Sequence, residues 1–127
     1  MRLVFGEKDA PYEEARVVVL PVPYDLSLSF LPGARRGPEA ILLASRELEP
    51  FLLELGAAPE EVGIHAAEPV PWVAGMAEES HRLIREEALK HLRAGKWLVA
   101  LGGDHSVTHP LVQAHREALG EFSLLHV

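Results

Sequence analysis

The sequence predicts an α/β fold with a parallel sheet, and two observations support this prediction. Short apolar runs typical of buried strands recur along the chain, and they alternate with segments whose apolar residues follow a helical period. Strands that alternate with helices form layered folds, in which right-handed crossovers make neighbouring strands parallel. With 127 residues, of which 48% are hydrophobic and 24% charged, the chain has the size and composition of one globular domain.

Proline marks the elements of the first half of the chain. Residues 16–20 form an apolar, β-branched run ended by Pro21 and Pro23, which predicts a buried strand. A long loop is expected over residues 21–37, at the carboxyl end of that strand. Pro38 then opens a helix, because proline is tolerated at the first helical positions. The apolar face of this helix is expected at Ile41, Leu42, Ser45 and Leu48.

The second half repeats strand and helix more clearly. Residues 76–92 form the strongest helical pattern, which Gly95 stops. A further helix is expected to be capped by Ser106 or Thr108 and to run to Leu119. The strands expected in this half are residues 62–66, 96–101 and 121–127.

Composition excludes several classes of function. The formal net charge of −7 argues against nucleic acid as a partner and favours a small cationic substrate. The absence of cysteine removes disulfides, thiolate zinc sites and cysteine nucleophiles. The first residues lack the pattern of a secretion signal, and no apolar window is long enough to span a bilayer. We therefore expect a cytoplasmic protein with no membrane partner.

The composition also favours a thermophilic source. The chain has no Asn, a single Gln and ten Pro, and charges of alternating sign follow one another at i, i+4 spacing from Glu78 through Arg82 and Glu86 to Lys90. A GC-rich genome is the alternative explanation for the abundance of Arg, Ala and Pro.

The candidate for chemistry is the run from Gly102 to His105, directly after the apolar residues 96–101. Ligands in open α/β sheets collect at the carboxyl ends of the strands, so His105 is well placed to hold a metal ion. The glycines let the backbone turn sharply and let other groups approach closely. The residues alone leave other interpretations open: a tight turn, a helix cap at Asp104, and a hydrogen-bonding histidine. The run does not match a phosphate-binding loop.

The other histidines are not expected to bind a metal ion. His109 lies four residues after His105, but the Glu of a zinc-binding HExxH pattern is absent, so we expect His109 to be structural or exposed. Histidines within helical segments should be solvated, whereas those within strand segments should be satisfied core residues. The first group comprises His81, His91 and His115, and the second comprises His65 and His126.

Two motifs resemble the ureohydrolase family of agmatinases, arginases and formimidoylglutamases. Residues 101–108, together with Pro110, resemble the first signature of that family. The upstream loop resembles agmatinases more than arginases, and its matching positions are residues 21–25, Ser27 to Ser29, residues 31–38, Ala40 and Ile41. The resemblance covers the chain from Arg16 to its end in consistent order.

The resemblance implies a three-layer α/β/α fold and hydrolysis of a guanidino group by a pair of manganese ions. It gives His105 the role of a terminal ligand of one metal, and Asp104 a role in holding the turn. The other family ligands come from a DAHxD run and a later Asp-x-Asp, and the chain reaches Val127 where DAHxD would begin. We therefore expect residues 1–127 to be the N-terminal part of one domain, with no catalytic residue assigned and no complete manganese site.

Two hypotheses about the function remain. In the first, the complete protein converts agmatine to putrescine and urea, with arginine or another guanidino compound as the alternative substrate; residues that contact the substrate are not assigned. In the second, the chain is a non-catalytic half-domain that assembles with itself or with a separate second half. Self-association is expected in either case, because apolar surface left exposed at about 25 cal/mol per Å² costs several kcal/mol over a few hundred Å².

Overall fold

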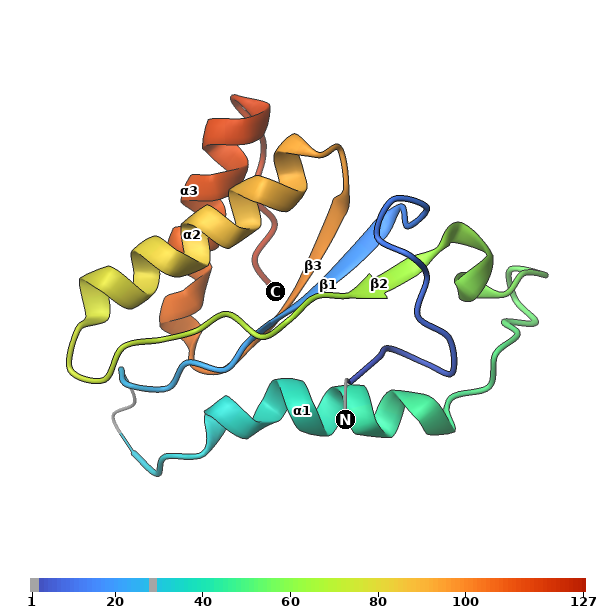
Figure 1. Cartoon of the computed structure of the whole chain (residues 1–127), viewed down its shortest axis with the longest axis horizontal. Coiled ribbons are helices and arrows are strands. Elements are labelled where there is room, and N and C mark those ends of the chain that lie inside the picture. Colours follow the sequence, from blue (N-terminus) through green and yellow to red (C-terminus); the bar gives the residue numbers. More distant parts are fainter. Residues whose placement is uncertain (1–2, 28–29) are drawn as a thin grey trace.

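A three-stranded parallel sheet organises the computed structural model, which describes residues 3–27 and 30–127. The strands are β1 (Val17–Val22), β2 (Ile64–Ala66) and β3 (Trp97–Gly102), in the spatial order β2-β1-β3. Both neighbours run parallel to β1, so the parallel sheet predicted from the alternating pattern is confirmed. Figure 1 shows β1 in the middle of the sheet, with all three strands pointing toward the same edge.

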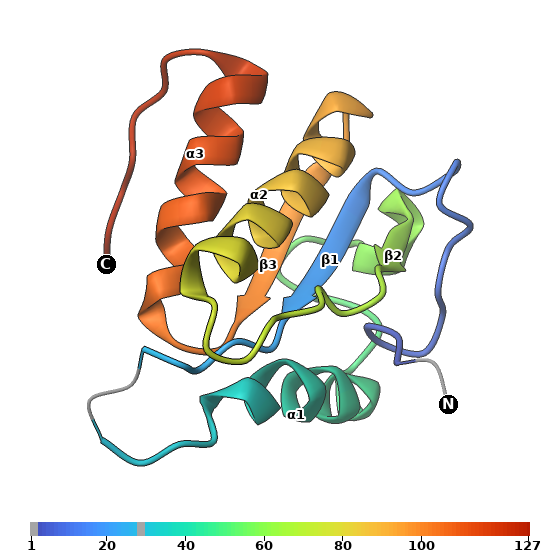
Figure 2. The same ribbon diagram turned by 60° about the vertical axis from the view of Figure 1, so that its left-hand side comes forward.

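Helices cover both faces of the sheet. Helix α1 (Gly37–Ala44) lies on one face, whereas α2 (Ala77–Arg93) and α3 (Thr108–Leu119) lie side by side on the other. Short 3-10 turns occupy Ala34–Arg36, Ser45–Glu47, Pro59–Val62 and His105–Val107. The arrangement is the three-layer α/β/α architecture implied by the resemblance, and Figure 2 shows the layers from a second direction.

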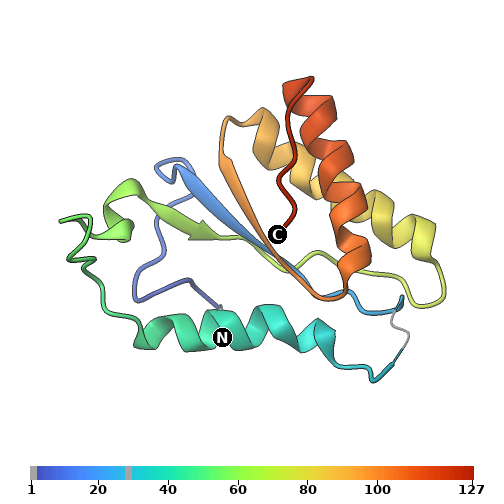
Figure 3. The ribbon, with the colours of Figure 1, turned by 180° about the vertical axis from the view of Figure 1, so that it is seen from behind.

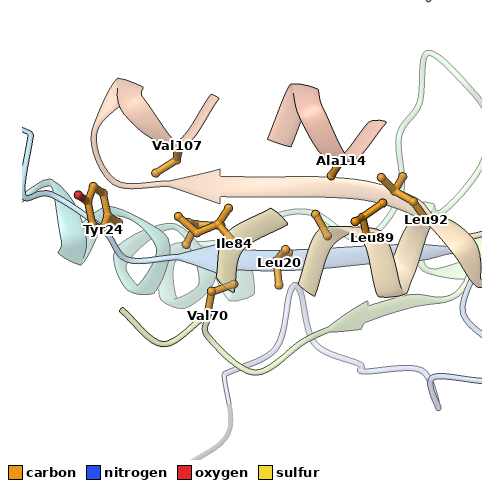
Figure 4. Packing of buried hydrophobic residues seen from close by; sticks show 10 residues of the cluster. Leu20, Tyr24, Val70, Ile84, Leu89, Leu92, Val107 and Ala114 are labelled. Atoms are coloured by element: carbon orange, nitrogen blue, oxygen red, sulfur yellow. The ribbon is translucent and has the colours of Figure 1, made fainter. Parts of the chain in front are cut away.

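The core is divided by the sheet into two apolar clusters. On the α2 and α3 side, Leu20 and Val22 of β1 contact buried residues of both helices, among them Ile84 and Ala114 (Figure 4). On the α1 side, buried Val19 packs with Leu42 and Ile64. Successive residues of a strand face opposite sides of a sheet, so a continuous apolar run such as Val17–Val22 is needed to fill both clusters.

The predicted helices are confirmed close to their expected ends. The cap predicted at Ser106 or Thr108 is wrong, because α3 begins at Thr108 and its N-cap residue, Val107, makes no side-chain cap hydrogen bond. Helix α2 ends at Arg93, and Gly95 follows in a left-handed conformation with φ of 74°. Pro38 occupies the first turn of α1, as predicted, but the α-helix stops at Ala44 and gives way to the 3-10 turn at Ser45–Glu47. Among the described residues, no helix is long and apolar enough to cross a membrane.

The charges on α2 pair in a different pattern from the one expected. Arg82 contacts Glu86 at i+4, but its other partner is Glu79 at 2.6 Å rather than Glu78. Lys90 pairs with Glu87 at 2.7 Å instead of Glu86. Spacings of three and four residues both bring side chains together on a helix, and here the three-residue partners are used alongside one four-residue pair.

The prediction that Pro21 ends the first strand is wrong. β1 continues to Val22, with Pro21 opposite Leu101 of β3. The carbonyl of Pro21 accepts a hydrogen bond from the N–H of Val70 at 2.9 Å, so the backbone polar groups of Pro21 point toward the side of β1 on which β2 lies. Because β2 has already ended at Ala66, the missing N–H of Pro21 removes no bond from the ladder.

The strand predicted over residues 121–127 is also wrong. Helix α3 ends at Leu119 and is followed by Gly120, where φ is 82°. Residues 121–127 are exposed and make no strand. They return alongside α3 in Figures 1 and 2, with the Phe122 ring 6.2 Å from that of His115. A strand exists only through pairing, and no described strand pairs with either this segment or the outer edge of β3.

Candidate functional site

The turn after β3 is built on a close approach between two backbone segments. Gly103 donates its N–H to the carbonyl of Val22 at 3.0 Å, and Asp104 donates to the carbonyl of Tyr24 at 2.7 Å. A Cβ atom on Gly103 would lie 1.9 Å from that Tyr24 oxygen. Gly103 is therefore required by contact and not by a positive φ, which the structure does not give it.

Asp104 holds this turn with both carboxylate oxygens. Its Oδ1 accepts the N–H of Ser106 at 2.9 Å and the hydroxyl of Ser106 at 2.5 Å. Its Oδ2 accepts the N–H of Ser27, from the loop after β1, at 2.9 Å. The side chain is buried and caps the 3-10 turn at His105–Val107. This agrees with the turn-holding role that the resemblance implies for Asp104 and with the alternative interpretation of Asp104 as a cap.

His105 is the exposed residue of the turn. It begins the 3-10 segment directly beyond the carboxyl end of β3, and its ring makes no hydrogen bond to any described residue. The ring lies 5.5 Å, between centroids, from that of His126. No group of three or more His, Asp or Glu side chains able to hold a metal is found among the described residues. The structure thus places the accessible imidazole of His105 at the edge where ligands of parallel sheets collect.

The loop after β1 is fastened by a buried carboxylate. Asp25 accepts the N–H groups of Gly33 at 2.9 Å and Arg35 at 3.2 Å, and the Nε of Arg35 lies 3.0 Å from its Oδ1. Burial raises the pKa of Asp25, but these bonds and the Arg35 charge outweigh it and hold the pKa below its ordinary value. The Arg35 guanidinium stacks over Trp72 at 5.3 Å. Ser29, part of the same motif, lies outside the described residues.

The histidine predictions are wrong for His126 and His91. His126 is exposed, because the segment that carries it is not a core strand. His91 is only 2% exposed and not solvated: its Nδ1 is 3.0 Å from the hydroxyl of Tyr12. Its Nε2 lies 3.2 Å from Glu87 but makes no hydrogen bond to a described residue. Burial lowers the pKa of His91, against the opposing charge of Glu87 and together with the like charges of Lys90 and His65.

Of the remaining histidines, His109 and His65 behave as expected, whereas His115 and His81, which were expected to be solvated, are half-buried. His109 is exposed, and His65 is satisfied by the carbonyl of Ala10 at 2.8 Å. His115 is half-buried and contacts the carbonyl of Leu111 at 2.8 Å. His81 differs from a solvated helix residue, because its ring is half-buried and its Nε2 reaches the hydroxyl of Ser106 at 3.4 Å.

Comparison with known proteins identifies relatives over the whole fold. Residues 15–127 match the arginase family. The chain is 97% identical over its whole length to the N(1)-aminopropylagmatine ureohydrolase of Thermus thermophilus and covers 43% of that protein. It superimposes on a hypothetical agmatinase from Burkholderia thailandensis with a TM-score of 0.81 and 30% identity, covering 94% of this chain and 39% of the other.

A more distant structure shares the fold. The formiminoglutamase of Trypanosoma cruzi, solved with Mn²⁺, gives a TM-score of 0.76 at 24% identity, over 86% of this chain and 37% of the other. The chain thus spans less than half the length of each of these relatives. The family match nevertheless extends from just before β1 through the turn that carries His105 to the last residue. The chain belongs to the arginase family.

Proposed function

We propose that the protein containing this chain hydrolyses the guanidino group of a small cationic amine, with His105 as a ligand of one ion of a manganese pair. The observation that carries the proposal is the contrast between two neighbours. Asp104 uses its carboxylate on Ser27 and Ser106, whereas His105 is exposed with no hydrogen bond to a described residue. An imidazole left accessible on a rigid turn is the arrangement that a metal ligand needs.

The described residues supply one candidate metal ligand, His105, and not the several ligands of a complete metal site. Manganese prefers several oxygen ligands, so a complete site requires carboxylates in addition to His105. When bound, such a pair supplies a Lewis acid for the guanidino group and a nucleophile at neutral pH. The residues of this chain contribute a metal-binding imidazole and the fixed turn beneath it. Asp25, Arg35 and Asp104 contribute order in the loop at the same edge.

The substrate proposed is an amine of the agmatine type. The name of the 97% identical relative favours N(1)-aminopropylagmatine over agmatine, the substrate expected from the resemblance. The net charge of −7 suits a substrate with several positive charges. Cytoplasmic location and assembly into a homo-oligomer complete the proposal. The competing hypothesis, a non-catalytic half-domain, is supported by the absence of a metal-holding group of side chains among the described residues.

Urea release tests the proposal. A protein that extends this chain to the length of its relatives should release urea from N(1)-aminopropylagmatine or agmatine when supplied with Mn²⁺, and residues 1–127 alone should not. In the longer protein, His105→Ala should lower the rate strongly, whereas the matched variant of the exposed His109, His109→Ala, should leave it unchanged. Turnover by the 127-residue chain would contradict the assignment of the missing ligands, and full activity of the His105→Ala protein would contradict the role of His105.

A further inference from the structure

His81 connects helix α2 to the turn that carries His105. It lies in the first half of α2, and its Nε2 is 3.4 Å from the hydroxyl oxygen of Ser106. The start of this helix is itself fixed, because the fully buried Ser80 hydroxyl accepts the N–H of Val73 at 2.9 Å and lies 3.0 Å from the carbonyl of Met76. His81 therefore approaches the turn from a rigid element.

The direction of the hydrogen bonds follows from the groups present. Ser106 has one hydroxyl proton, and its oxygen lies 2.5 Å from a carboxylate that can only accept. Ser106 therefore donates to Asp104, and its oxygen is left to accept from the Nε2–H of His81. The other carboxylate oxygen of Asp104 accepts from Ser27 at 2.9 Å. A series of hydrogen bonds from His81 through Ser106 and Asp104 to Ser27 thus joins α2, the turn at His105–Val107 and the loop after β1. We call it the polar series.

The ring of His81 is also held from the side. The ring of Tyr24 lies 5.3 Å away between centroids, and Tyr24 is only 1% exposed. The Tyr24 hydroxyl makes no hydrogen bond to a described residue, so Tyr24 offers His81 a packing surface and not a polar partner. The carbonyl of the same Tyr24 accepts the N–H of Asp104 at 2.7 Å. Tyr24 thus contacts two members of the polar series, His81 through its ring and Asp104 through its carbonyl.

We propose that His81 is a positioning residue for His105: by donating from Nε2 to Ser106, it fixes the Ser106–Asp104 pair and hence the turn on which the metal ligand stands. This role rests on the proposed function for its consequence, but the contact itself can be tested without a metal. Hydrogen bonds that polarise one another in series are stronger than isolated ones, so losing the first donor should loosen the later members.

Two variants separate the hydrogen-bond donor of the His81 side chain from its packing. In His81→Gln, the side-chain amide can place an N–H near the position of Nε2, whereas His81→Leu fills the space without a donor. For the 127-residue chain, we expect His81→Leu to speed amide hydrogen exchange of Ser106 and Ser27 about fivefold, the factor expected from one lost hydrogen bond. His81→Gln should restore slow exchange. Exchange of Ser106 and Ser27 is expressed relative to the amide of Val19 in β1, which reports global unfolding, so that any change in overall stability cancels.

The tautomer of His81 gives a second, spectroscopic test. Long-range nitrogen–proton correlation at about pH 8 should show the ring proton of His81 on Nε2 and none on Nδ1. A proton on Nδ1 would overturn the proposal. Equal exchange of Ser106 and Ser27 in the wild-type, Leu and Gln proteins would also overturn it, as would a Gln variant that exchanges as fast as the Leu variant.

Metal affinity in the longer protein distinguishes this inference from the proposed function. Calorimetric titration with Mn²⁺ should show weaker binding, by several-fold, for His81→Leu and wild-type binding for His81→Gln. If His105→Ala leaves Mn²⁺ binding unchanged, the proposed function fails. If His105→Ala weakens binding while His81→Leu changes neither affinity nor exchange, the positioning role fails and the proposed function stands.

Discussion

The amide of Ser27 donates to the carboxylate of Asp104 at 2.9 Å, across 77 residues of sequence. Ser27 belongs to the loop after β1, and Asp104 begins the turn after β3. The two loops at the carboxyl edge of the sheet are thus joined by a single buried carboxylate. This places the two sequence motifs that resemble ureohydrolases in direct contact, although nothing in their sequence spacing requires it.

Replacing Asp104 should loosen both loops. Asp104→Ala removes the acceptor of three hydrogen bonds, from the amide and hydroxyl of Ser106 and the amide of Ser27. We expect a loss of about 2–4 kcal/mol in the free energy of unfolding, since the donors are left partly buried. Urea denaturation measures it. Asp104→Asn keeps one acceptor oxygen and should cost less; an Ala variant as stable as the wild type would contradict the role of this carboxylate.

Two glycine variants test the close approach at the turn. In Gly103→Ala the new methyl group would lie 1.9 Å from the carbonyl oxygen of Tyr24, so backbone must move. The expected loss in unfolding free energy is more than about 3 kcal/mol. The control is Gly37→Ala, where φ is −55° and the new Cβ would lie at an ordinary 3.4 Å from the carbonyl of Gly102. That variant should stay within about 1 kcal/mol of the wild type by thermal or chemical denaturation.

His91 should make stability depend on pH. Burial holds its pKa below the ordinary 6.5, so the unfolded chain takes up a proton at a higher pH than the folded chain does. The stabilising contribution is complete above about pH 6.5 and is lost as the pH falls through the folded pKa of His91. The groups around it are Tyr12, His65, Glu87 and Lys90.

The measurement is the unfolding free energy of wild type and His91→Leu between about pH 7 and pH 5. The wild type should lose stability faster than the variant over this range, because the leucine carries no proton. Parallel curves for the two proteins would show that the burial of His91 has no effect on protonation.

The turn at His105 and the helices could be predicted because their signals are local. Gly95 ends α2 and Asp104 caps the next turn through atoms only a few residues away. The buried position of His91 had a signal that was overlooked: it lies on the same face of α2 as Ile84 and Ala88, at spacings of seven and three residues. A histidine on an apolar face of a helix is expected to be buried.

The failures concern relationships that the local sequence does not contain. The apolar residues 121–127 have the composition of a strand, but a strand forms only when a partner lies beside it, and none of the described strands does. Pro21 remains in β1 because the neighbouring strand is short. The Asp25–Arg35 pair and the contact of His81 with Ser106 join residues whose proximity depends on the folded loop and the sheet.

Self-association should occur through the outer edge of β3. Trp97 and Val99 on this strand are 74% and 47% exposed, and no described strand pairs with the edge. Exposed apolar edge strands attract other chains. The 127-residue chain should therefore sediment as a dimer or larger species at micromolar concentration, and Trp97→Lys should shift it toward monomer. A cooperatively melting wild-type monomer would show that this edge is stable without a partner.

Counting bound manganese tests the central claim, that His105 is a metal ligand on a turn fixed by Asp104. The protein extended to the length of its relatives is dialysed against Mn²⁺, and the metal per chain is measured for wild type, His105→Ala and the control His109→Ala. We expect a manganese pair in the wild type and the control, and the loss or clear weakening of one ion in His105→Ala. A His105→Ala protein that holds both ions with wild-type affinity would contradict the central claim.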